Sequence, residues 1–309
     1  MNKFYSFLFI FSLAGYFGAN AQQQFTYTQY IDNLTPINPA WSLTRDTGSI
    51  DMATRKQWVN VDGAPSTFML NGSQPIKKID AVYGFTLLSD KVAIENLTEF
   101  NVFFGKSIKV GANSFLATAI NGGFRVYNAL YSTLDVNDPA LFNKDIRETK
   151  GNIGASVQFF IPGKFYAGLS LPRLSIRKLG VGSVAGSLNI RNFYFLNLGY
   201  QFKISTDLEL HNSVVIAYTA NVPVQADIAS KVWLKEAFGM GVSYRLSNEI
   251  AILSSYKTGS FRIGYSYQFG LGSTRLIGFN SGTHEVVLGY TLGRRNVTPK
   301  IDLTPAVKQ

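Results

Sequence analysis

Residues 260–269 read SFRIGYSYQF, and their side chains alternate between two kinds. Large apolar or aromatic residues take turns with small or polar ones: Phe261, Ile263, Tyr265, Tyr267 and Phe269 against Arg262, Gly264, Ser266 and Gln268. Because successive side chains of a β-strand point to opposite faces, this stretch predicts a strand with one apolar and one polar face.

The same alternation recurs in residues 151–161 (GNIGASVQFFI) and 165–171 (FYAGLSL). Transmembrane β-barrels show this pattern, with apolar side chains toward lipid and polar side chains toward the lumen. A soluble β-sandwich also alternates and is the alternative. An export signal, strands of about ten residues and the lack of helical segments between strands favour the barrel.

Composition agrees with a β-rich membrane protein. The chain has 28 Gly, 24 Phe and 16 Tyr, charged residues make up only 16%, and no run of 18 apolar residues follows Gln22. We therefore predict an all-β fold: a transmembrane antiparallel β-barrel of about 14 strands, with an N-terminal plug-like segment and a short C-terminal tail.

The lengths of the expected connections support this topology. Strands are expected to start near residues 49, 66, 80, 97, 112, 151, 163, 191, 208, 234, 248, 260, 274 and 283. The long connections are then the fifth (125–150), the seventh (172–190) and the ninth (220–233), whereas the even connections are short. Outer-membrane barrels have long extracellular loops and short periplasmic turns, and an even strand number closes the sheet with both termini in the periplasm.

The N-terminus predicts export. Lys3 precedes an apolar run over residues 4–17, and Ala19-Asn20-Ala21 is a small-x-small cleavage site. A membrane anchor is the alternative, but the run is shorter than the ~20 residues of a spanning helix. We expect a signal peptide (1–21, cleaved after Ala21), a segment at 22–48 that is periplasmic or plugs the lumen, an outer-membrane barrel at 49–294 and a periplasmic tail at 295–309.

Charge and residue types exclude several functions. The formal net charge is +10, and removal of Lys3 with the signal leaves 28 basic and 19 acidic residues spread along the chain. This pattern suits anionic lipid or sugar phosphates better than nucleic acid, which would need clustered cations beside stacking aromatics. The absence of cysteine excludes disulfides, thiolate metal sites and a cysteine nucleophile.

Catalytic patterns are equally sparse. His211 and Ser213 share a strand face that Asn212 does not, which argues against a Ser/His/Asn set. His284-Glu285 has no second histidine nearby, and residues 135–145 lack the glycine and distal glutamate of a calcium loop. We predict a non-enzymatic protein with no catalytic residue, no metal and no cofactor.

Five stretches together resemble the PorP/SprF-like membrane proteins of the Bacteroidetes type IX secretion system. They are FTYTQYIDNLTPINPA (25–40), RKQWVNVDGAPST (55–67), YGFTLLSDKV (83–92), NDPALF (137–142) and SGTHEVVLGY (281–290). They span the mature chain in the family's order. The departures PAWSLTRD (39–46) and KVAIEN (91–96) concern local turns.

The resemblance implies an outer-membrane barrel that works with the type IX system without being its translocation channel. Such proteins assist secretion or surface anchoring of a partner, often a large adhesin with a type B C-terminal domain, with a link to gliding motility. The alternatives are a core envelope-spanning component that contacts periplasmic secretion and peptidoglycan-binding subunits, a solute channel and an outer-membrane hydrolase. The implied partners are a type IX-secreted surface protein, other type IX components and outer-membrane lipid.

Motifs and alternation together select the candidate partner-binding or lumen residues. They are Gln29, Tyr30, Asn38, Pro39, Arg55, Gln57, Trp58, Gly63, Ala64, Pro65, Asp90 and Lys91. In the first strand, we expect Ile50, Met52, Thr54, Lys56 and Trp58 on the lipid face and Asp51, Ala53, Arg55 and Gln57 on the lumen face.

The first hairpin refines these expectations. Trp58 is expected in an aromatic girdle at the strand's outer end, and Arg55 is expected to pair with Asp51 inside the barrel. Asp62-Gly63 is expected to form the turn, after which Phe68 and Leu70 resume the lipid face. Arg55 and Gln57 are then the residues least explained by lipid, and they are expected to hold a plug or a partner.

Overall fold

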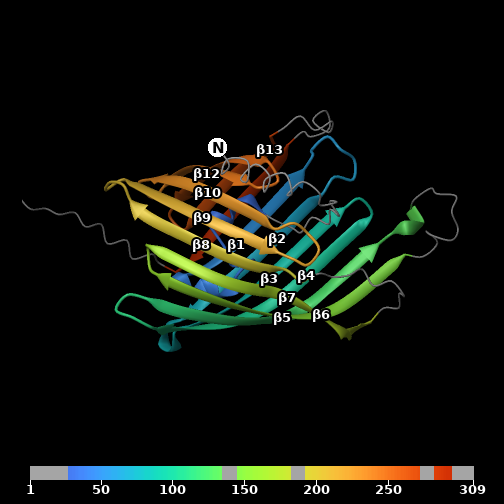
Figure 1. Ribbon diagram of the computed structural model, residues 1–309, viewed down its shortest axis with the longest axis horizontal. Helices are drawn as coiled ribbons and strands as arrows, with labels where there is room; N and C mark the ends of the chain where they lie inside the picture. Colours follow the sequence, from blue (N-terminus) through green and yellow to red (C-terminus); the bar gives the residue numbers. More distant parts are fainter. Residues whose placement is uncertain (1–26, 134–144, 182–191, 272–281, 294–309) are drawn as a thin grey trace, which may run out of the picture.

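The computed structural model describes residues 27–133, 145–181, 192–271 and 282–293, and these residues form a closed antiparallel barrel of 14 strands (Figure 1). The strands are β1 (Gly48–Gln57), β2 (Ser66–Ile76), β3 (Ala81–Val92), β4 (Glu95–Lys109), β5 (Phe115–Ala129), β6 (Ile146–Ile161), β7 (Phe165–Val181), β8 (Tyr194–Lys203), β9 (Leu208–Tyr218), β10 (Gln225–Leu234), β11 (Phe238–Arg245), β12 (Glu249–Thr258), β13 (Phe261–Gly270) and β14 (Thr283–Leu292). Each strand pairs with its neighbours in sequence, and β14 closes the ring on β1. The predicted fold class is confirmed.

Short 3-10 helices make up the helical part of the described chain: η2 (Thr28–Ile31), η3 (Pro39–Thr44), η4 (Lys77–Ile79) and η5 (Tyr131–Thr133). No helix in the described ranges is long and apolar enough to cross a membrane. The expected signal peptide, the expected tail and the NDPALF stretch lie outside the described residues.

The two faces of the strands are those that the alternation predicts. In β13, Phe261, Ile263 and Tyr265 are exposed on the outside, whereas Arg262 and Ser266 are buried in the lumen. In β1, Asp51, Ala53 and Arg55 are buried while Ile50, Thr54 and Lys56 are exposed. A sheet closed into a barrel has only an inner and an outer face, so the period of two carries through every strand.

Aromatic pairs lie on the outer surface toward both ends of the barrel. Phe261 stands opposite Tyr290 with ring centroids 4.9 Å apart, and Phe238 stands opposite Tyr256 at 4.7 Å. Toward the other end, Tyr194 stands opposite Tyr218 at 6.2 Å. Two such belts are the usual interface anchors of an outer-membrane barrel.

The two ends of the barrel differ in connection length. We call one the turn end, with the connections 77–80, 110–114, 162–164, 204–207, 235–237 and 259–260; the other is the loop end, with 58–65, 93–94, 130–145, 182–193, 219–224, 246–248 and 271–282. β1 starts and β14 finishes at the turn end. Because short turns face the periplasm in such barrels, we infer that the turn end is periplasmic.

One expected strand position was wrong even though the strand number was right. The expected ninth loop, 220–233, contains most of β10, and the strand expected from residue 274 lies outside the described residues. The sequence QADIASKVWL does alternate, but Asp227 and Lys231 on its inner face resemble loop residues unless partners for their charges are known. As a result, residues 246–248 lie at the loop end, not among the periplasmic turns.

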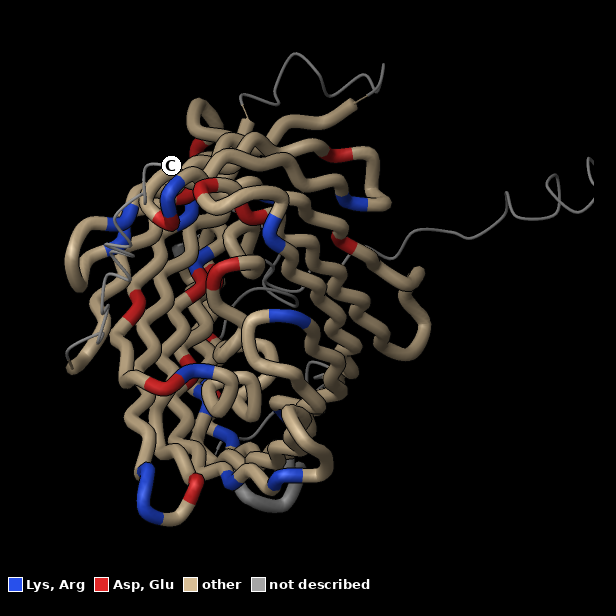
Figure 2. The backbone as a smooth tube through the Cα atoms, turned by 90° about the vertical axis from the view of Figure 1, so that its left-hand side faces the viewer, with Lys and Arg blue, Asp and Glu red and all other residues tan. Residues whose placement is uncertain are grey.

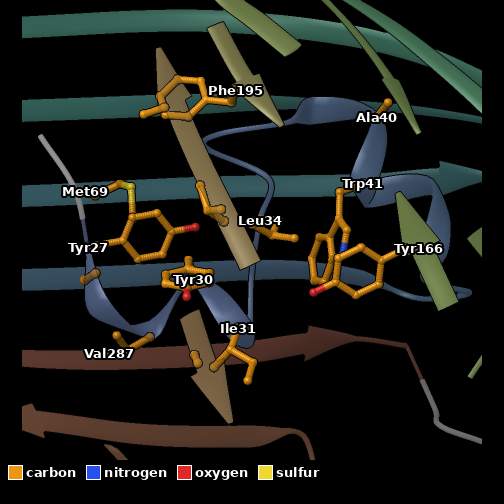
Figure 3. Packing of buried hydrophobic residues seen from close by; sticks show 14 of the residues in the cluster. Tyr27, Tyr30, Ile31, Leu34, Ala40, Trp41, Met69, Tyr166, Phe195 and Val287 are labelled. Carbon is orange, nitrogen blue, oxygen red and sulfur yellow. The ribbon is translucent and has the colours of Figure 1, made fainter. Parts of the chain in front are cut away.

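Residues 27–47, here called the plug, run inside the barrel. Tyr27, Tyr30, Leu34 and Trp41 pack against inward-facing residues of several strands, including Met69, Tyr166, Phe195 and Val287 (Figure 3). Pro36 and Pro39 remove backbone donors, and the Asn33 side chain accepts the Thr35 N–H, so the segment forms turns rather than another strand.

Candidate functional site

The start of the plug is bound by a buried carboxylate of the barrel wall. Glu285 of β14 accepts hydrogen bonds from the backbone N–H groups of Thr28 and Gln29, at 2.8 and 2.9 Å. These groups open η2 and have no partner within the helix. Arg55 of β1 is the register partner of Glu285 and donates to the Gln268 side chain at 2.9 Å. Glu285 therefore sits between a cation of the neighbouring strand and the plug backbone.

Asp32 is the second anchor of the plug. Its carboxylate lies 2.8 Å from Lys231 Nζ of β10 and 2.8 Å from an Arg262 nitrogen of β13, and Ser255 of β12 donates to it at 3.1 Å. The Lys231 side chain has no exposed surface. Buried charges need partners of this kind, since an unpaired charge in the interior is strongly unfavourable.

The ion-pair network continues from Asp32 toward the end of the plug. Arg262 also donates to Asp51 of β1 at 2.7 Å, and Arg45 of the plug lies 3.5 Å from Asp51. Arg45 donates to the backbone carbonyl of Asp32 at 2.8 Å as well. The network thus ties both ends of the plug to the wall and to each other.

The environment of Asp32 fixes its protonation state. Burial on its own would raise the pKa of this carboxyl, but Lys231 and Arg262 lower it, and the net pKa lies well below the ordinary value. Asp32 is therefore ionised at any physiological pH, and its ion pairs persist.

The middle of the plug is held by amide groups instead of charges. The Asn38 side-chain nitrogen donates to Gln158 of β6 and Asn197 of β8, both at 2.9 Å. The Ala40 N–H donates to the Ser156 hydroxyl at 3.1 Å. These wall groups are buried, and Gln158 and Asn197 are also bonded to each other at 2.9 Å, so Asn38 joins a polar group that the wall already holds together.

A cavity of about 410 Å³ remains at the turn end, between the plug and the barrel wall. Its lining includes Asp32, Arg45, Asp51, Lys257, Arg262 and the two tryptophans Trp41 and Trp233. Lys257 Nζ lies 3.6 Å from the Trp233 ring centroid, and the Arg45 guanidinium lies 4.6 Å from that of Trp41. Two further cavities among the described residues measure about 30 and 20 Å³, room for about one water each.

The candidate residues fall into separate groups. Gln29, Tyr30 and Arg55 lie in the lumen near Glu285 and Lys231. Asn38 lies in the lumen against β6 and β8, and Pro39 opens η3, which packs against β5 and β6. The remaining candidates lie at the rim of the loop end and outside the ion-pair network: Gln57, Trp58, Gly63, Ala64, Pro65, Asp90 and Lys91.

The rim group joins two neighbouring connections. Gly63, whose φ of 72° suits a glycine, accepts the Ala93 N–H at 2.8 Å, which ties segment 58–65 to the β3–β4 turn. Asp90 accepts the Thr67 hydroxyl at 2.6 Å, and Lys91 is exposed. Trp58 follows the last residue of β1 with a φ of 44° and is 37% exposed.

The expected ion pair between Arg55 and Asp51 was wrong. Both side chains face the lumen, but residues four apart in a strand are about 13 Å apart along it. Each has a nearer partner on a neighbouring strand: Asp51 bonds to Arg262, and Arg55 lies opposite Glu285. Cross-strand register, which the alternation leaves undetermined, decides these pairs.

The central charged residues of the network were not among the candidates. Asp32, Lys231, Arg262 and Glu285 were overlooked because each was assigned another role: motif residue, loop residue, polar face and possible metal ligand. The available signal was a charged residue at an inward position in the middle of a strand, which implies an opposite charge close by.

Histidine and metal chemistry find little support in this arrangement. Within the described ranges, no three His, Cys, Asp or Glu residues lie close enough to hold a metal ion. His211 contacts Glu209 at 3.4 Å, whereas the Ser213 hydroxyl accepts a hydrogen bond from Tyr166.

Comparison with known proteins gives one family and a set of distant barrels. The family described as type IX secretion system membrane protein PorP/SprF matches residues 19–290. No curated protein matches the sequence significantly.

Similar solved structures are outer-membrane barrels. The monoaromatic hydrocarbon channel CymD has a TM-score of 0.50 and 12% identity, over 83% of this chain and 91% of that chain. The deltaS2S3 mutant of TodX, a toluene transporter of Pseudomonas putida, has 0.50 and 10%, over 84% and 94%. Omp33 of Acinetobacter baumannii has 0.45 and 8%, over 80% and 98%. At these identities the likeness concerns the fold alone.

Proposed function

The chain belongs to the PorP/SprF family of type IX secretion system membrane proteins, and from this membership we propose a non-enzymatic outer-membrane barrel that assists secretion or surface anchoring of a partner protein. The proposed partner is a large type IX-secreted adhesin with a type B C-terminal domain, with a role in gliding motility. In the same proposal, the signal peptide is cleaved after Ala21 and residues 295–309 form a periplasmic tail.

The occupied lumen is the observation that carries this proposal. Asp32, Asn38 and the N–H groups of Thr28 and Gln29 bind three regions of the inner wall, and the apolar cluster of the plug fills the space between them. A solute channel would need this segment to leave, which would break the ion pair of Lys231 with Asp32 and the backbone hydrogen bonds to Glu285. This arrangement supports a barrel that binds a partner protein rather than an open solute channel.

The candidate residues divide between two roles in this proposal. Arg55 and Gln29 hold the plug through Glu285 and its surroundings. The rim residues Trp58, Gly63 and Lys91 lie at the loop end, which we infer to be extracellular, and form part of the surface that receives the partner.

Deletion of the gene tests the function directly. Surface biotinylation should show that the adhesin is lost from the cell surface, and a plasmid copy of the wild-type barrel should restore it. A variant with Trp58→Ala and Lys91→Ala should fold but restore less, whereas Thr206→Ala, at the turn end, should restore fully. An adhesin that reaches and stays on the surface without the barrel would refute the proposal.

Co-purification separates the alternatives. After gentle detergent extraction, a dedicated dock should retain the adhesin, whereas a core envelope component should retain periplasmic secretion subunits instead. A hydrolase would show an activity that His211→Ala abolishes, and we expect none.

A further inference from the structure

Four lysines gather at one sector of the turn end. Lys77 and Lys78 belong to η4, and Lys106 and Lys109 lie in the last turn-end residues of β4. The Ser107 N–H donates to the Asp80 carbonyl at 2.8 Å and holds η4 beside β4. Figure 2 looks onto this end and shows lysine and arginine positions on several of its turns. We call these four residues the lysine patch.

The lysine patch has an unbalanced charge. All four side chains are exposed, and Asp80 is the one acidic residue of the η4 turn. In the part of the chain that the structure describes, none of the four lysines takes part in an ion pair. Other lysines of this barrel do, such as Lys203 with Glu209 at 3.4 Å. The patch therefore presents uncompensated positive charge to its surroundings.

An exposed apolar surface adjoins the patch, with Tyr83 and Phe104 on the side toward the middle of the barrel and Ile108 on the side toward the turn end. Tyr83 and Phe104 are register partners on the outer face, 53% and 46% exposed, and Ile108 is 56% exposed. Lys106 lies on the same outer face, two residues and about 7 Å along the strand from Phe104. The aliphatic part of a lysine side chain can lie along the apolar surface and place its ammonium group at the level of the lipid headgroups, while neighbouring aromatic rings stay in the hydrocarbon layer.

We propose that the lysine patch with Tyr83, Phe104 and Ile108 is a binding site for an anionic phospholipid of the leaflet at the turn end. The ammonium groups bind the headgroup phosphate, and the outward aromatic and aliphatic side chains contact the acyl chains. Two features favour a lipid over an acidic protein: the patch borders the membrane-facing surface, and the apolar residues beside it point outward into the bilayer. The proposal is independent of the secretion role.

Native mass spectrometry of the full-length mature barrel in neutral detergent tests the site. The probes are phosphatidylglycerol and phosphatidylcholine with the same acyl chains. We expect phosphatidylglycerol to bind more tightly, and each lysine replaced by glutamine to weaken its binding about fivefold, because each lysine near an anionic surface contributes on the order of 1 kcal/mol. High salt should weaken it in the wild type as well.

A matched pair of variants makes the result specific. Lys77→Gln with Lys78→Gln should remove most of the preference for phosphatidylglycerol, whereas Lys56→Gln with Lys91→Gln, the same charge change at the loop end, should leave it intact. All four positions are exposed, and resistance of the folded band to detergent without heating checks that each variant folds.

Four outcomes would overturn the proposal. The first is equal binding of the two lipids by the wild type, and the second is a preference that survives loss of the patch lysines. The third is competition by inorganic phosphate at the same concentration as the lipid, which would assign the site to free phosphate. A variant that keeps its lipid but loses a periplasmic protein from extracted complexes would identify the patch as a protein dock and would equally refute a lipid site.

Discussion

At Asp32, one carboxylate joins the plug to three strands, through Lys231 of β10, Ser255 of β12 and Arg262 of β13. Nothing in the local sequence TQYIDNLTP distinguishes this aspartate from a turn residue. Its partners are more than 190 residues away in the chain. Alternation predicts which side chains face the lumen, but pairing depends on register across strands, and for this reason Arg55 was matched with the wrong acid.

Substitution of Asp32 tests how much the buried ion-pair network contributes to the free energy of unfolding. Asp32→Asn keeps the size of the side chain but leaves Lys231 and Arg262 short of a counter-charge. Breaking a buried ion pair costs about 3–5 kcal/mol, so urea unfolding of the purified barrel in lipid should show a loss of that order. Asp46→Asn, an exposed position of the same segment, should change stability by less than about 0.5 kcal/mol. Equal effects of the two variants would contradict the role given to Asp32.

Lowering the pH far enough to protonate Asp32 should reduce the stability that its ion pairs give the barrel. The pKa of Asp32 is lowered in the folded barrel relative to about 3.9 in the unfolded chain. The stabilisation is therefore complete above pH 4–5, roughly, and is lost as pH falls through the folded-state pKa. The stability difference between wild type and Asp32→Asn should be constant from about pH 7 to 5 and shrink in stronger acid. A difference that stays constant in stronger acid as well would show that the pKa of Asp32 is the same in the folded and unfolded chain.

At the scale of elements, strands with a continuous large apolar outer face were predicted, and β10, whose outer face includes Ala226 and Ser230, was not. β13 was predicted although it carries Arg262 inside, because its outer face is aliphatic or aromatic at every second position, from Phe261 to Phe269. β10 carries Asp227 and Lys231 inside, and its charged residues led to the prediction of a loop there. Both charges are tolerated inside the barrel because Asp227 pairs with Arg245 and Lys231 pairs with Asp32. These contacts form only in the closed barrel with the plug in place.

The plug is the element whose removal should change the barrel most. Deletion of residues 27–45 empties the middle of the lumen, whose wall is polar, and should open a water-filled path. Planar-bilayer recordings should show steady conductance for the deletion variant and silence for the wild type. A variant with Leu34→Ala keeps the plug and its anchors and should stay silent, although it loses about 2–5 kcal/mol of packing. Steady wild-type conductance would favour the solute channel instead.

At the scale of the whole molecule, closure of the ring follows from the even strand number, and it places the start of β1 and the finish of β14 at the same end. The strand number was predicted correctly although one strand was missed and another was expected where none is described. The missed strand β10 did not change the parity of the fifth and seventh connections, because both precede it in the chain. The sequence therefore predicted the closed barrel and its strand number more accurately than the positions of individual strands.

The orientation of the barrel in the membrane links the two proposals, because it puts the rim residues outside the cell and the lysine patch in the periplasmic leaflet. The chain contains no cysteine, so single cysteines can be introduced without background. Asp62→Cys lies at the loop end and Asn113→Cys at the turn end, and both positions are exposed. A membrane-impermeant maleimide added to intact cells should label Asp62→Cys and not Asn113→Cys, whereas both should react in lysed cells. The reverse pattern would place the short turns outside, and it would move the lysine patch to the outer leaflet and the rim residues to the periplasm.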